Sequence, residues 1–221
     1  MNFNITPIEV RILGCLIEKE AATPDVYPLT LNSLLTACNQ KSSREPVMEL
    51  TSDDLMTAID NLIDKTLVST WKSGHNRMAK YQHKLRHRVS DKFNFSLPEL
   101  AVLSVLFLRG PQTVGEIRTR CSRIHEFENL DAVECVLKAL DDNPDGPYVT
   151  MLSRQEGRKE PRYTHLFCGK PDETAMSSTG FERAASGDNP RVEALELQVS
   201  ELKSELQALK QRLEIFMKQF E

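Results

Sequence analysis

Apolar residues recur in steps of three and four in three stretches of the first 65 residues, which is the spacing that lines one face of a helix. Between Leu67 and Tyr81 the spacing changes. Two short runs rich in β-branched and aromatic residues flank the turn KSGHNR at 72–77, which predicts a β-hairpin. Three helices followed by a hairpin is the order of a winged helix-turn-helix domain, in which the hairpin is the wing. The predicted elements are helices over about residues 7–19, 30–38 and 51–65, and strands over 67–71 and 78–81.

Most of this pattern returns about ninety residues later. The stretch Phe93–Gly110 (FNFSLPELAVLSVLFLRG) repeats Phe3–Lys19 (FNITPIEVRILGCLIEK), and each begins with Phe-Asn, a hydroxyl residue, a proline and a glutamate. The segments Thr6–Glu9 and Ser96–Glu99 are each typical of a capping box, in which a hydroxyl and a carboxylate satisfy free N–H groups at the start of a helix. We therefore predict two copies of one small domain.

The second copy keeps the core positions of the first and differs at loops. Cys38 and Cys121 fall at equivalent apolar places, so we expect both thiols to be buried by packing. Leu100–Leu108 is apolar on nearly every side, and a helix that is apolar all round is buried all round. We expect this helix at the junction between the two copies or at a subunit interface. The second wing is predicted over residues 148–152 and 162–166.

A polar tail follows the two copies. Residues 170–189 are small and polar, which is typical of a flexible linker, and Asn189-Pro190 is a start signal for a last helix. From there apolar residues alternate in steps of three and four over about four heptads, the a/d pattern of a coiled coil. We expect a homodimer held by this helix; the alternative is a helix that lies on its own domain. The predicted dimerisation residues are Val192, Leu195, Val199, Leu202, Leu206, Leu209, Leu213 and Phe216.

Composition limits the class of protein. The 221 residues are 40% hydrophobic and 27% charged, as in ordinary globular proteins. There is no run of 18 apolar residues and no signal peptide, so we expect a cytoplasmic protein without a membrane partner. The five cysteines lack metal-ligand spacing, and no nucleophile elbow, phosphate-cradling glycine loop or paired-carboxylate site appears. We therefore expect no metal, no cofactor and no enzymatic activity.

The formal net charge is −4, so any case for nucleic acid must be local. Residues 72–92 hold seven basic residues against Asp91 alone, a local charge of +6, and a smaller basic cluster lies in the second wing. Such strips fit phosphate contacts, which position a protein on DNA without reading its sequence. The alternative is a pair of solvated hairpins. The predicted nucleic-acid-binding residues are Lys72, His75, Arg77 and Lys80 in the first wing, and Arg154, Arg158, Lys159 and Arg162 in the second.

The third helix of each copy does not fit DNA as its partner. In a helix-turn-helix pair this helix faces the major groove, but the outward face of both copies is acidic, and carboxylates repel phosphates. The expected outward residues are Asp53, Thr57, Asp60, Asn61 and Asp64 in the first copy, and Asp131, Cys135, Lys138, Ala139 and Asp142 in the second. Neither helix is typical of a base-reading helix.

Three long segments carry a family resemblance. They are TPIEVRILGCLIEKE, ATPDVYPLTLNSLLTACNQKSSREPVMEL and LPELAVLSVLFLRGPQTVGEIRTRC, and they resemble the YceH-like family of bacterial tandem winged-helix proteins over about residues 3–169. The resemblance implies two winged helices and a bacterial cytoplasmic origin. It implies no ligand, because the family has no assigned activity.

The sequence thus predicts an α+β fold, mainly α with small β-hairpins, made of two tandem winged helix-turn-helix domains and a C-terminal coiled-coil helix. The expected function is non-enzymatic DNA binding of the transcription-regulator type, through phosphate contacts of the basic wings to duplex DNA. The alternative is a protein–protein adaptor whose acidic third helices meet a basic partner. The predicted parts are domain 1 at residues 1–88, domain 2 at 89–169, the linker at 170–189 and the coiled-coil helix at 190–221.

Overall fold

The computed structural model describes residues 4–71, 78–86, 93–153 and 160–169. The chain divides into two compact units, residues 1–177 and 178–221, and every described residue belongs to the first. The predicted linker and all the predicted dimerisation residues lie outside the described residues.

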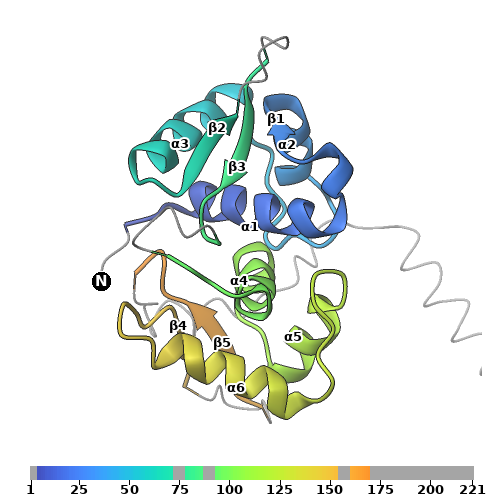
Figure 1. The fold of residues 1–221 in the computed structure, drawn as a ribbon, viewed down its shortest axis with the longest axis vertical. Helices are drawn as coiled ribbons and strands as arrows, with labels where there is room; N and C mark the ends of the chain where they lie inside the picture. Colours follow the sequence, from blue (N-terminus) through green and yellow to red (C-terminus); the bar gives the residue numbers. More distant parts are fainter. Residues whose placement is uncertain (1–3, 72–77, 87–92, 154–159, 170–221) are drawn as a thin grey trace, which may run out of the picture. The chain divides into compact units, whose positions relative to one another are not determined.

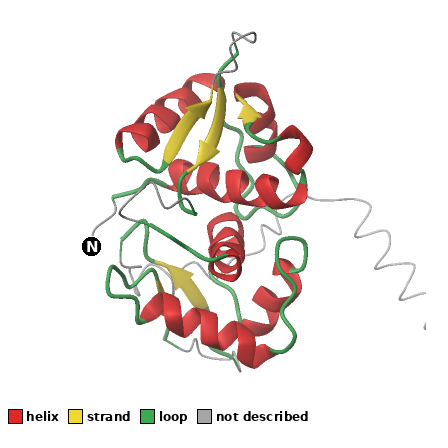
Figure 2. Cartoon of the chain, in the orientation of Figure 1, coloured by secondary structure: helices red, strands yellow, loops and turns green. Residues whose placement is uncertain are grey.

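The described residues form an α+β fold with six α-helices and two small antiparallel sheets (Figure 1). Each half of the repeat has three helices followed by a hairpin, as the sequence pattern predicts, and Figure 2 shows the strands of the two hairpins in separate sheets. The first half contains α1 (Pro7–Ala22), a short 3-10 helix (Pro24–Val26), β1 (Leu29–Thr30), α2 (Leu31–Cys38), α3 (Ser52–Asp64), β2 (Val68–Trp71) and β3 (Lys80–His83). The second half contains α4 (Leu97–Arg109), α5 (Val114–Cys121), α6 (Leu130–Asp141), β4 (Val149–Met151) and β5 (Tyr163–His165).

Helix starts follow the predicted capping signals. The Glu9 carboxylate accepts a hydrogen bond from the Thr6 backbone N–H at 2.8 Å, and Glu99 accepts one from the Ser96 N–H at 2.7 Å. The predicted end of the first helix is wrong by three residues, because Glu20-Ala21-Ala22 continue it until Thr23 caps it just before Pro24.

The sheets differ from the prediction in two places. The first sheet has the order β1-β3-β2, and the two-residue strand β1 was not predicted, since a strand so short carries no alternating pattern. The return strand of the first hairpin is Lys80–His83 rather than 78–81, because His83 is buried at the inner end of the sheet although it is polar. The repeat extends even to β1: Leu29 pairs with Tyr81, and Gln112 forms the matching bridge with Tyr163.

The two halves share one hydrophobic core, in which α4 packs on α1. Figure 1 shows these two helices in the middle of the unit, with the remaining elements of each half on opposite sides. Leu100 to Leu108 are all buried, as predicted for a helix that is apolar all round. The crossing is close at Gly14, where an added Cβ would lie 2.9 Å from Leu108 Cγ. The Ser104 hydroxyl also donates to the Gly14 carbonyl oxygen at 3.3 Å.

Candidate nucleic-acid interface

The first hairpin is anchored firmly at its inner end. β2 and β3 pair in the register Val68 with His83 through Trp71 with Lys80. The His83 backbone N–H donates to the Tyr27 hydroxyl at 3.0 Å, and His83 Nε2 lies 2.9 Å from a Glu20 carboxylate oxygen. Burial raises the pKa of Tyr27 well above its usual range, so this hydroxyl stays neutral. The inner end of the hairpin is therefore fixed to the core by the contacts of His83.

Two residues that flank the turn of the first hairpin are exposed to solvent. Trp71, the only tryptophan of the chain, is 46% exposed at the end of β2, and Met78, just before β3, is 58% exposed. Lys80 lies directly opposite Trp71 in the sheet. The charge pattern of the sequence predicts Lys80 as part of a nucleic-acid surface but does not include Trp71. The signal that could have found Trp71 is a lone tryptophan next to Lys72 at a predicted turn.

The eight predicted binding residues are only partly within the described residues. Lys80 and Arg162 are described, and they occupy equivalent places in the two hairpins. Arg162 donates to the Pro111 carbonyl oxygen at 3.0 Å and lies 3.6 Å from the Glu116 carboxylate, so it is engaged within its own half. The Lys80 side chain has no hydrogen bond or ion pair among the described residues. The others, Lys72, His75, Arg77, Arg154, Arg158 and Lys159, lie outside the described residues.

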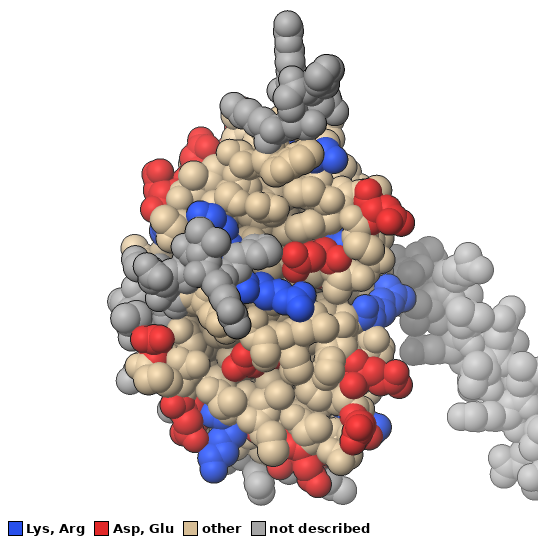
Figure 3. All heavy atoms as spheres, in the orientation of Figure 1, with Lys and Arg blue, Asp and Glu red and all other residues tan. Residues whose placement is uncertain are grey.

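The third helices, α3 and α6, expose the faces that the sequence predicts. Leu55, Ile59 and Leu62 are buried, while every predicted outward residue of both helices is exposed. Hydrogen bonds from Thr51 hold the pKa of Asp54 below its usual range, so the first turn of α3 is charged at neutral pH. Figure 3 shows carboxylates gathered over α3 and along α6. The exposed carboxylates are Asp53, Asp54, Asp60 and Asp64 on α3, and Asp131, Glu134 and Asp141 on α6, with Asp142 at its end.

Two buried arginines, which the sequence pattern does not single out, hold the long connection between α2 and α3. Arg44 donates to both carboxylate oxygens of Glu18, at 2.6 and 3.3 Å, and to the carbonyl oxygen of Ala37 at 3.0 Å. Arg11 donates to the carbonyl oxygens of Cys38 and Pro46. Because these partners are mostly backbone carbonyls, no local signal predicts them. The arginines fix the loop that separates the second and third helices of the first half.

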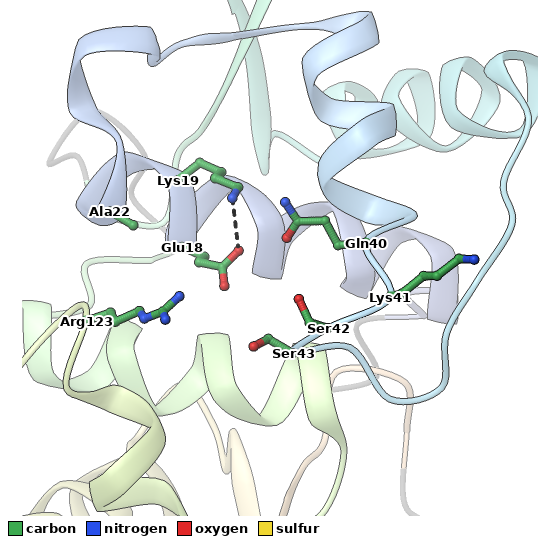
Figure 4. A pocket seen from close by; sticks show the side chains of 8 residues that line it. All are labelled: Glu18, Lys19, Ala22, Gln40, Lys41, Ser42, Ser43 and Arg123. Atoms are coloured by element: carbon green, nitrogen blue, oxygen red, sulfur yellow. Dashed lines mark ion pairs between the residues drawn. The ribbon is translucent and has the colours of Figure 1, made fainter. Parts of the chain in front are cut away.

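A shallow hollow of about 470 Å³ lies beside this loop (Figure 4). Three helices, α1, α2 and α5, end around it, and the cations Lys19, Lys41 and Arg123 line it. Cations near helix C-termini are favourable because those ends carry partial negative charge. Glu18 also lies in the hollow and is already paired with Arg44. Helix-end compensation thus accounts for the charges of the hollow without a ligand.

The described residues contain no group of three or more histidine, cysteine or acidic side chains placed to hold a metal ion. No helix within the described part of the chain is both long and apolar enough to cross a membrane. The predicted buried thiols Cys38 and Cys121 are buried, as is Cys15.

Comparison with known proteins settles the family. A family model described as “Protein of unknown function, DUF480” matches residues 5–158. The chain belongs to the DUF480 family. It is 43% identical over 209 residues to the UPF0502 proteins YceH of Salmonella newport (strain SL254) and Salmonella heidelberg (strain SL476), and the match covers 95% of this chain and 97% of each relative. The family resemblance predicted from the sequence is thereby confirmed.

Proposed function

We propose that this DUF480 protein is a non-enzymatic DNA-binding protein, in which each half is a winged helix and the first hairpin is the wing that grips duplex DNA. In each half, the order of three helices and an antiparallel hairpin supports the winged-helix part of the proposal. The grip is on the phosphate backbone, so binding has little dependence on base sequence.

One observation carries the DNA-binding part. Trp71 and Met78, which flank the turn of the β2–β3 hairpin, are exposed, and the sequence places three cations in or beside this turn. The Lys80 ammonium group has no partner among the described residues, and Lys72 and Arg77 belong to the sequence segment that connects the two strands. In a chain of net charge −4, such a local excess of positive charge gives an anionic polymer a place to bind.

The acidic faces of α3 and α6 agree with a backbone grip. A base-reading helix needs donors that reach into a groove between two rows of phosphates. α3 instead exposes four carboxylates. Repulsion keeps such a face away from DNA, which leaves the wing to supply the affinity.

A salt series on the full chain tests this proposal. Replacing Lys72, Arg77 and Lys80 with alanine should weaken binding to all duplex sequences alike. It should also reduce the slope of log affinity against log salt by about 0.9 for each phosphate that is no longer neutralised. The matched control replaces Lys41, Arg123 and Lys138, three exposed cations outside the hairpins, and changes the net charge equally. An equal loss of affinity in both variants would contradict a wing-centred interface.

A second function is favoured by the acidic third helices, namely an adaptor that binds a basic protein through α3 and α6. Asp60→Asn with Asp64→Asn removes two exposed charges from α3. If α3 approaches DNA, this change should tighten DNA binding at low salt, where repulsion is least screened. If α3 docks on a basic protein, DNA binding should stay the same while recovery of that protein falls. Asp25→Asn with Asp145→Asn, also exposed, is the control.

A further inference from the structure

We infer that Trp71 is a base-contacting residue: its indole packs against nucleobases of the DNA while the opposite residue, Lys80, binds an adjacent phosphate. The inference rests on the proposed DNA-binding function and assigns the chemistry of its wing. It is carried by a difference between the two hairpins.

The two hairpins have the same register, so their residues can be compared place by place. Val68 pairs with His83 in the first hairpin, and Val149 pairs with His165 in the second. Three residues further along each strand pair, Trp71 with Lys80 corresponds to Leu152 with Arg162. The second pair is also joined, since the Leu152 N–H donates to the Arg162 carbonyl oxygen at 2.8 Å. Each hairpin therefore carries one large apolar residue opposite one cation at its outer end.

In the second hairpin, both residues of this pair contact other residues of the second half. Leu152 is partly covered, and Arg162 contacts both the Pro111 carbonyl oxygen and the Glu116 carboxylate. Glu116 is in the first turn of α5. Its carboxylate also accepts a 2.9 Å hydrogen bond from the backbone N–H of Thr113, the residue that caps the start of this helix. The cation and the apolar residue of the second hairpin thus stabilise the second half itself.

In the first hairpin the internal counter-ion is replaced. The residue that corresponds to Glu116 is Ser33, whose hydroxyl lies 2.9 Å from that of Thr30 and carries no charge. Among the described residues, Lys80 has no ion pair, and Trp71 has no ring or cation–π contact. Single exposed apolar residues are common in proteins. An exposed indole directly opposite an uncompensated ammonium group, at the place where the other half satisfies both, is a more specific arrangement.

The chemistry of this pair selects its ligand. Directly opposite residues of an antiparallel pair have Cβ atoms about 4.5–5.5 Å apart and project from the same face. A ligand that satisfies both must offer a flat apolar surface and an anion within about one side-chain length, as a nucleotide does. Stacking of a base on an aromatic side chain strengthens binding about 5- to 150-fold and tolerates any base, which matches a wing that does not read sequence.

The experiment uses the full chain and the emission of its one tryptophan. Titration with duplex DNA, and separately with a single strand of the same sequence, should quench this emission in step with binding measured by electrophoresis. The titration with duplex DNA tests whether Trp71 contacts bases that are partly unstacked within a duplex. The titration with the single strand tests contact with bases that are already unpaired. Trp71→Ala should weaken binding at least about fivefold, the equivalent of 1 kcal/mol, without changing the salt slope. Lys80→Ala should lower the slope by about 0.9, because it removes a phosphate contact.

Two controls keep the result interpretable. Met151→Ala removes an exposed apolar residue from the second hairpin and should leave affinity unchanged. Trp71→Phe keeps an aromatic face and should restore most of the affinity that Trp71→Ala loses. Unchanged thermal unfolding of the variants shows that the core is intact.

Failure of the inference and failure of the proposed function give different results. DNA binding that persists in Trp71→Ala with its full affinity, or without quenching in the original chain, overturns the role of Trp71 alone. No DNA binding by the original chain overturns the proposed function. Quenching by anionic lipid vesicles but not by DNA would assign the pair to a membrane surface and would overturn both.

Discussion

Two histidines in the same place of the repeat have different surroundings. His83 lies beside the Glu20 carboxylate. The residue that corresponds to Glu20 in the second half is Gly110, so His165 has no such partner. Its Nδ1 has no hydrogen-bond partner among the described residues, and its ring meets Phe107 edge-on at 5.0 Å. Burial lowers the pKa of His165 to about 4. A single replaced residue therefore exchanges a polar contact for an apolar one.

The pH dependence of stability should reflect this difference. An unfolded histidine takes up a proton near pH 6.5, whereas folded His165 does so only near pH 4, so protons favour unfolding between these values. We expect His165 to lower the free energy of unfolding by up to about 2 kcal/mol at pH 5 relative to pH 7.5. His165→Phe should remove that component, and His125→Phe should not. Denaturant unfolding at the two pH values measures it, and equal pH dependence in the original chain and His165→Phe would contradict the assignment.

At the scale of elements, the contact of α1 with α4 depends on one small residue. Gly14 leaves room for Leu108 and for Phe107, whose Cβ would lie 3.0 Å from an added Cβ. A glycine inside a helix costs about 1 kcal/mol relative to alanine, so its presence here reflects the close approach of the two helices.

Gly14→Val should therefore destabilise the protein by about 2 kcal/mol, because overpacking a filled core costs about 1–3 kcal/mol. Gly115→Ala is the matched control. Gly115 lies in α5 with nothing within 4 Å of an added Cβ, so helix propensity alone should stabilise that variant by about 0.5–1 kcal/mol. Denaturant unfolding measures both. A Gly14→Val variant as stable as the original chain would mean that the helices can separate without cost.

The elements also show what sequence can and cannot predict. The helices and the burial of Leu100–Leu108 follow from periodicity and capping, because both are local properties. β1 could not be predicted, since it exists only through pairing with β3. Arg11 is buried where backbone carbonyls of the distant residues Cys38 and Pro46 converge on it, and no local pattern encodes that convergence. At the candidate interface, charge counting found Lys80 but could not separate it from Arg162, because only the fold brings Arg162 beside Glu116.

At the scale of the whole molecule, the heptads at Val192–Phe220 predict a dimer, and these residues lie outside the described part of the chain. Light scattering of the full chain at tens of micromolar should give twice the chain mass of 25.1 kDa. Leu202→Asp with Leu209→Asp places charges at core positions and should give the monomer mass. Ser204→Asp with Gln211→Asp, at outward positions of the same heptads, should leave the dimer intact. A monomer mass for the original chain would remove the coiled coil.

The sharing of one core between two halves has a consequence for synthesis. The ribosome makes α1 before α4, yet α4 packs on the side of α1 that includes Gly14, and α4 follows about ninety residues later in the chain. The backbone N–H of Ile5 likewise donates to the carbonyl oxygen of Phe167 at 3.3 Å, a bond that can form only after Phe167 has been added to the chain. Domains generally fold as units while the chain is being made, N-terminal first. Here the side of α1 that packs on α4 leaves the ribosome uncovered, and we expect it to stay exposed to other proteins until α4 has been translated.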